Sequence, residues 1–133
     1  MLSKPAKTLV IGGNIWYLGE GMLGPLFAVF AERVGGDVLD ISWAWAAYLF
    51  ATGAAMMVAS RVADARKSQA RMMMCGYALN AACTFGYLFV SSPLHLLIVQ
   101  LGLGIANALA TPTWNALYAR FEDRQHECTT WGL

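Results

Sequence analysis

The stretch LVIGGNIWYLGEGMLGPLFAVF, residues 9–30, decides the fold, because it is apolar over the length of a membrane and yet holds a carboxylate. A helix needs about 20 predominantly apolar residues to cross a bilayer. Glu20 lies near the middle of the stretch, where a carboxylate costs about 2.5–3.5 kcal/mol on insertion scales. Such a residue usually faces a water-filled cavity or a polar partner, and it often marks the path of an ion or a solute.

Three further segments of spanning length predict an all-α membrane protein. Of its 133 residues, 58% are hydrophobic and 13% are charged, whereas a soluble domain is about 45–50% apolar and about 25% charged. The net charge of +1 gives no sign of a nucleic-acid partner. We expect one helical unit in the lipid bilayer, with membrane helices at residues 9–30, 41–60, 72–90 and 94–117.

Turn residues indicate where these helices begin and end. Gly35-Gly36-Asp37 breaks the chain after the first segment, and Asp40 or Ser42 is expected to cap the second. Ser91-Ser92-Pro93 supplies a cap followed by proline at the first helical position, where its missing N–H is harmless. Because this last connection is short, the third and fourth helices should form an antiparallel hairpin.

Basic residues predict which side of the membrane each connection faces. The connections after the first and third segments together carry one basic residue, Arg33. The others lie before the first segment, between the second and third, and after the fourth: Lys4, Lys7, Arg61, Arg66, Lys67, Arg71, Arg120 and Arg124. Cytoplasmic loops carry an excess of Lys and Arg, so both termini are expected in the cytoplasm and the protein in the cell membrane.

Polar residues share one face of the first helix. Asn14, Tyr17, Glu20 and Gly24 are spaced by three, three and four residues, which places them along one side of a helix. Pro25 follows and can bend the helix. Glu20 is expected to line a solute or proton pathway; the alternative is a neutral glutamic acid that locks the first helix to the fourth by a hydrogen bond.

The fourth helix carries a second polar face. Asn107, Thr111 and Asn115 recur every four residues, and Pro112 interrupts the hydrogen-bond ladder among them. Thr111, like Thr52 and Asn80 elsewhere, would ordinarily hydrogen-bond across helices and hold the bundle together.

Small and aromatic residues suggest packing and anchoring. Small residues let helix backbones approach closely in lipid, and they recur every four positions in the second and fourth segments: Ala47, Ala51, Ala55 and Ala59, and Gly102, Ala106 and Ala110. Aromatic residues near the ends of the same segments suit an interfacial belt: Trp43, Trp45, Tyr48, Trp114 and Tyr118.

Nothing in the sequence predicts an enzyme. It holds no nucleophile–base pair, no phosphate-binding glycine loop and no metal-ligand spacing. We therefore expect no catalytic residues, no metal and no cofactor.

Two stretches resemble the major facilitator superfamily of transporters. Residues 60–76, SRVADARKSQARMMMCG, are similar to that family's signature loop between its second and third helices, with Ser60 in place of a glycine. The matching residues are Asp64, Arg66, Lys67 and Arg71. Residues 100–117 resemble the family's fourth helix, in which a glycine-rich half precedes a proline.

The resemblance implies a secondary transporter that moves a small solute by alternating access between two six-helix halves. Helices one and four line its central cavity, so the cavity residues would be Tyr17, Glu20, Asn107, Thr111 and Asn115, and a carboxylate there suits proton coupling. The implied partners are the solute, protons and the remainder of the transporter, because the chain is expected to be an N-terminal part that ends before a fifth helix.

Two other interpretations stay open. A complete four-helix homodimer similar to the small multidrug resistance family would have about this length and a glutamate in its first helix. A non-transporting membrane scaffold would use Glu20 only to hold helices together.

Overall fold

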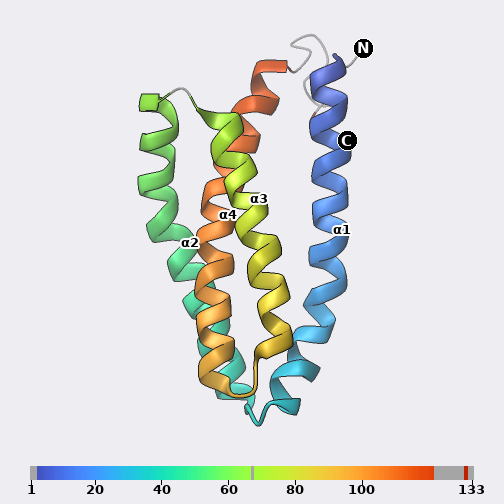
Figure 1. Ribbon diagram of the computed structural model, residues 1–133, viewed down its shortest axis with the longest axis vertical. Coiled ribbons are helices and arrows are strands. Elements are labelled where there is room, and N and C mark those ends of the chain that lie inside the picture. The colour runs from blue at the N-terminus through green and yellow to red at the C-terminus, as the bar shows by residue number, and fades with distance from the viewer. Residues whose placement is uncertain (1–2, 67, 122–130, 132–133) are drawn as a thin grey trace.

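The computed structural model describes residues 3–66, 68–121 and 131, and this part of the chain is helical almost throughout (Figure 1). It contains four α-helices and one short 3-10 segment: α1 (Lys4–Arg33), α2 (Val38–Arg66), α3 (Gln69–Gly86), η1 (Tyr87–Phe89) and α4 (Pro93–Phe121). The helices run alternately up and down, so the α1–α2 and α3–α4 connections lie together at one end (Figure 1).

The expected class, an all-α membrane protein, is confirmed. In the described part, α2, α4 and the segment formed by α3 with η1 are long and apolar enough to cross a membrane. α1 was expected to span as well, but it does not meet the same hydropathy criterion. It is 30 residues long, yet glycines and the polar residues Asn14 and Glu20 interrupt its apolar run. A fourth span therefore stays a prediction.

The start of α2 corrects one expectation about helix caps. Asp37, and not Asp40 or Ser42, is the capping residue: its Oδ1 accepts the N–H of Asp40 at 2.9 Å, and Asp40 Oδ2 accepts the N–H of Asp37 at 3.2 Å. Ser42 lies inside the helix, where its hydroxyl donates to the Val38 carbonyl at 2.8 Å. The reciprocal pair satisfies two backbone donors at once, which a single cap at Asp40 would not do.

The start of α4 follows the expected pattern. The helix begins at Pro93, and the Ser92 hydroxyl accepts the N–H of His95 at 3.4 Å. The short connection brings α3 and α4 together as an antiparallel pair (Figure 1).

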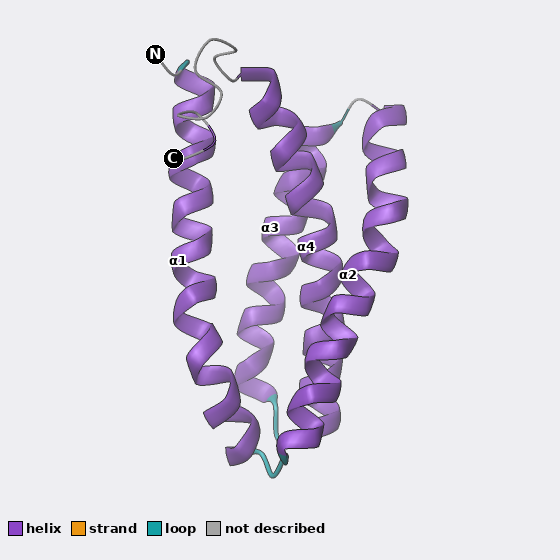
Figure 2. Cartoon of the chain, turned by 180° about the vertical axis from the view of Figure 1, so that it is seen from behind, coloured by secondary structure: helices purple, strands orange, loops and turns teal. Residues whose placement is uncertain are grey.

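α4 is the central helix and packs along both α2 and α3 (Figure 2). The approach is closest at two glycines. A Cβ on Gly104 would lie 2.6 Å from the Tyr48 carbonyl oxygen of α2, and a Cβ on Gly76 of α3 would lie 2.9 Å from the Ala106 carbonyl oxygen of α4. The backbones of α2 and α3 thus approach α4 so closely that neither glycine position has room for a side chain. The three helices form one tightly packed unit.

α1 lies beside this unit and packs less closely against it than α2, α3 and α4 pack together (Figures 1 and 2). At the end that holds the α1–α2 connection, Ala31, Ala44 and Leu96 form a buried apolar cluster. Phe30 of α1 makes an edge contact with Tyr87 there, with ring centroids 5.5 Å apart. Towards the other end, α1 and α4 are held together by Trp114, as described below.

Candidate functional site

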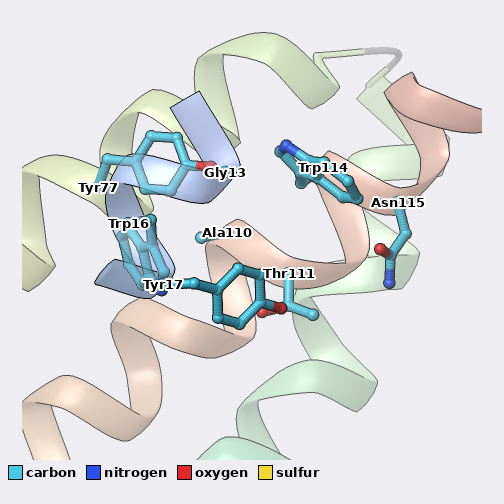
Figure 3. A pocket seen from close by; sticks show the side chains of 8 residues that line it. All are labelled: Gly13, Trp16, Tyr17, Tyr77, Ala110, Thr111, Trp114 and Asn115. Atoms are coloured by element: carbon cyan, nitrogen blue, oxygen red, sulfur yellow. The ribbon is translucent and has the colours of Figure 1, made fainter. Parts of the chain in front are cut away.

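Three hollows lie between α1 and the other helices. The aromatic hollow, of about 30 Å³, is lined by Gly13, Trp16, Tyr17, Tyr77, Ala110, Thr111, Trp114 and Asn115 (Figure 3). The outer hollow, of about 300 Å³, adjoins it and is lined by Val10, Gly13, Asn14, Tyr17, Trp114, Asn115, Tyr118 and Trp131. The Glu20 hollow, of about 80 Å³, lies further along α1 and is lined by Glu20, Leu23, Gly24, Phe27, Trp45, Tyr48, Thr84, Tyr87, Gln100 and Leu103.

Trp114 of α4 positions one side of the aromatic hollow. Its indole N–H donates to the Leu9 carbonyl of α1 at 3.1 Å. Gly13 leaves room for the indole, because a Cβ there would lie only 3.3 Å from Cζ2 of Trp114. Tyr118 stacks on the same ring, with centroids 4.8 Å apart. The indole is thus fixed from both helices.

Trp16 and Tyr77 form the opposite side of the aromatic hollow. Their ring centroids lie 4.6 Å apart, which joins α1 to α3. Tyr17 points towards α4, and Figure 3 shows it across from Trp114 with Thr111 beside it. The hollow therefore has rings on several sides and the polar groups of Thr111 and Asn115 on α4.

The Glu20 hollow brings Glu20 together with residues of α2, α3, η1 and α4. Tyr48 of α2 stacks on Trp45, with ring centroids 5.3 Å apart. Gln100 of α4 is 3% exposed, so its amide lies inside the helix packing. Among the described residues that line this hollow, Glu20 is the single charged one.

A chain of hydrogen bonds connects the aromatic hollow with the Glu20 hollow. The Thr111 hydroxyl donates to Asn107 Oδ1 at 2.5 Å, and Asn107 Nδ2 donates to the Tyr48 hydroxyl at 2.9 Å. Thr52 was expected to bond across helices, but its hydroxyl donates to the Tyr48 carbonyl within α2 at 2.8 Å. Asn107 and Tyr48 thus make the cross-helix bond that ties the polar face of α4 to α2.

The structure divides the five expected cavity residues into three groups. Tyr17, Thr111 and Asn115 line the aromatic hollow, and Glu20 lines the hollow that bears its name. Asn107 lines neither hollow, but its side chain is hydrogen-bonded to Thr111 of the aromatic hollow and to Tyr48 of the Glu20 hollow.

Of the signature-loop residues, Asp64 and Arg71 are described, and they line none of the three hollows. Asp64 is exposed near the end of α2, and Arg71 is exposed near the start of α3. Lys67 lies outside the described residues, as do the side chain of Arg66 and the whole of Arg124.

Several lining residues were not identified from the sequence. Tyr48 and Trp114 were assigned to an interfacial belt, and Trp16 and Tyr77 were not singled out. Gln100 had a detectable signal, since it lies seven residues before Asn107 and so falls on the same face of α4.

Three helices meet the criterion for crossing a membrane, and a carboxylate, amides and hydroxyls gather in hollows between them and α1. These features indicate a multi-pass membrane protein of the transporter class. The sequence profile of the Major Facilitator Superfamily matches residues 9–133. The chain belongs to that superfamily.

One curated relative matches over a large share of this chain. It is an uncharacterized MFS-type transporter of Methanocaldococcus jannaschii, 30% identical over 95 residues, which are 71% of this chain and 24% of that protein. The chain thus spans about a quarter of the length of the curated relative that it matches. No solved structure matches the chain significantly.

Proposed function

We propose that this chain is the first part of a secondary transporter that moves a small solute across the cell membrane by alternating access, with Glu20 as its proton-binding group. The observation that carries the proposal is the position of Glu20, which is the single charged residue among the described residues that line the hollows between α1 and the rest of the bundle. A carboxylate inside a membrane bundle is expensive and commonly belongs to a proton or substrate path.

The other expected pathway residues support the same function. Tyr17 lies one helical turn before Glu20 on α1 and shares the aromatic hollow with Thr111 and Asn115 of α4. Transporters of this architecture bind solute near the middle of the membrane between parts that rock against each other.

The test is proton-driven solute uptake by the intact protein in proteoliposomes, with a broad panel of solutes. Glu20→Gln should abolish uptake driven by an imposed pH gradient, because the amide cannot bind and release a proton. Glu32→Gln is the matched control, since Glu32 is also on α1 but lines none of the hollows. Its uptake should equal that of the unchanged protein.

Other outcomes would favour the other two interpretations. If the Glu20→Gln protein transports like the control, Glu20 is structural and proton coupling through it is wrong. If the intact protein moves no solute at all, the result favours the interpretation as a non-transporting membrane scaffold. If a 133-residue chain alone transports and Glu20 residues of two copies crosslink, the four-helix homodimer is favoured.

A further inference from the structure

Gln100 of α4 lines the Glu20 hollow with a side chain that the helices enclose almost completely. It is 3% exposed, and its amide is hydrogen-bonded to none of the residues that the structure describes. Among those residues, every side-chain nitrogen or oxygen that is fully buried has a hydrogen-bond partner. The Gln100 amide therefore touches the open space of the hollow.

Four further polar side chains face the same space, each from a different element. They are Glu20 of α1, Tyr48 of α2, Thr84 of α3 and Tyr87 of η1. The Tyr48 oxygen accepts a hydrogen bond from Asn107 Nδ2 at 2.9 Å, which leaves its own O–H to donate in another direction. Together with the amide of Gln100, these groups offer both donors and acceptors to an occupant of the hollow.

The size of the hollow decides between a solute and water as that occupant. Its volume of about 80 Å³ is well below the roughly 300–1,000 Å³ of sites that bind small molecules. The same volume holds about two to three water molecules at about 30 Å³ each. Buried water needs about three polar partners, and a buried amide is costly without a hydrogen bond. The five polar side chains around the hollow meet both requirements.

We propose that the Glu20 hollow is a hydration site, in which ordered water bridges the Gln100 amide and the Glu20 carboxyl group. Both side chains line the hollow, and neither is hydrogen-bonded to the other. An amide can donate through Nε2 and accept through Oε1, so it can hold water beside either an ionised or a protonated carboxyl group. Gln100 is thus a positioning residue. The inference deepens the proposed function, because it assigns the surroundings of the same proton-binding group.

The experiment is infrared difference spectroscopy on the intact protein in detergent, across a step from acid to neutral pH. The step titrates carboxyl groups, whereas Tyr48 and Tyr87 in the same lining keep their protons, because tyrosine ordinarily titrates near about pH 10. Bands of ordered water are recognised because they shift in heavy-oxygen water. At least one such water band should disappear in Glu20→Gln, which no longer titrates at this position.

Variants of Gln100 test which residue holds the water. Gln100→Leu has similar size but no polar group, so it should abolish the Glu20-dependent water band. The carbonyl band of protonated Glu20, identified by its loss in Glu20→Gln, should move to higher frequency, because the group loses hydrogen bonds. Gln100→Asn keeps an amide and should keep the water band.

Gln69→Leu is the matched control for the loss of a buried amide. Gln69 is 7% exposed at the start of α3 and lines none of the three hollows. This variant should keep both bands of the unchanged protein. If Gln100→Leu also keeps both, Gln100 does not position the water and the proposal is wrong.

The proposal would also be overturned if no water band depended on Glu20, because the remainder of the protein would then occupy the hollow. The Glu20→Gln comparison tests the water even if Gln100→Leu does not fold. The two proposals fail in different ways. A Glu20-dependent water band together with unchanged uptake by Glu20→Gln would support the hydration site and contradict proton coupling. Loss of uptake in Glu20→Gln without such a band would support proton coupling and contradict the hydration site.

Discussion

Tyr48 and Asn107 come from α2 and α4 and form the hydrogen bond that crosses between these helices at 2.9 Å. Within membranes such bonds contribute modestly, because the unfolded helices also find partners in the bilayer. The side-chain oxygen of Asn107 also accepts a hydrogen bond from the Thr111 hydroxyl. The pair therefore fixes the polar face of α4 towards both the aromatic hollow and the Glu20 hollow.

We expect Tyr48→Phe and Asn107→Ala to be coupled in their effects on stability. Either change removes the same hydrogen bond, so the double variant should lose less than the sum of the two single variants. The coupling should be about 0.6 kcal/mol and at most about 1.7 kcal/mol. A double-mutant cycle on unfolding in detergent measures it. A coupling near zero would mean that the bond contributes nothing to the folded state.

Some of the individual residues of the site could be predicted from the sequence. Tyr17 and Glu20 were placed on one face because the spacing of residues within a single helix fixes their relative direction. Tyr48 and Tyr77 were not assigned to the site, because which residues of other helices face α1 depends on how the helices pack. Spacing along one segment carries no information on that packing.

At the level of helices, the close approach of α4 to its neighbours depends on glycines. A Cβ on Gly76 would lie 2.8 Å from the backbone nitrogen of Ala110 and 2.9 Å from the carbonyl oxygen of Ala106. Both are backbone atoms, which cannot turn aside as a flexible side chain would. The α3–α4 distance is therefore set by the absence of a side chain at this position.

Gly76→Ala should destabilise the protein by about 1–3 kcal/mol, the usual cost of overpacking a closely packed interior. Gly53→Ala is the matched control, because Gly53 lies inside α2 and a Cβ there would meet nothing within 4 Å. The control should be neutral or slightly stabilising, since alanine favours helix more than glycine does. The measurement is thermal unfolding in detergent, and equal melting temperatures would show that α3 and α4 can move apart freely.

Trp114 gives α1 its attachment near the start of that helix. Trp114→Phe removes the N–H that donates to the Leu9 carbonyl and reduces the ring that packs on Gly13. Hydrogen exchange should become faster in the first half of α1, while α2, α3 and α4 keep their protection. Trp43→Phe, at a 64% exposed position of α2, is the control. Unchanged exchange in α1 would show that other contacts hold it.

The helices themselves could be predicted more fully than their ends. Long apolar segments predicted four helices, and the structure extends α1, α2 and α4 beyond those segments at both ends. α3 begins earlier than expected, at Gln69, but ends at Gly86, before the expected end at residue 90. The cap of α2 was assigned wrongly, because Asp37 and Asp40 are both good capping residues. The choice depends on which side chain the backbone brings to which N–H.

At the level of the whole molecule, most of the described basic residues gather at one end, whereas Arg33 lies at the other. The start of α1, the end of α2, the start of α3 and the end of α4 all lie there (Figure 1), and with them Lys4, Arg61, Arg71 and Arg120. The opposite end carries the α1–α2 and α3–α4 connections. An excess of Lys and Arg marks the cytoplasmic side of membrane proteins, so the basic end should face the cytoplasm.

Labelling of single cysteines tests this orientation and, with it, whether α1 crosses the membrane. In an intact protein without native cysteines, Glu32→Cys and Ser91→Cys should react with an impermeant maleimide outside the cell. Ser3→Cys and Ala65→Cys lie at the basic end and should react only after permeabilisation.

The residue at position 3 decides the question for α1, whose hydropathy does not meet the criterion that the other helices meet. If α1 spans, Ser3→Cys and Glu32→Cys lie on opposite sides, and Ser3→Cys is protected together with Ala65→Cys. If α1 lies along the surface, Ser3→Cys reacts from outside together with Glu32→Cys, and Ala65→Cys alone stays protected. A pattern reversed at all four positions would keep the spans but place the basic end outside. Protection at Ser3 is the expected result, because a pathway through Glu20 requires α1 to reach both sides of the membrane.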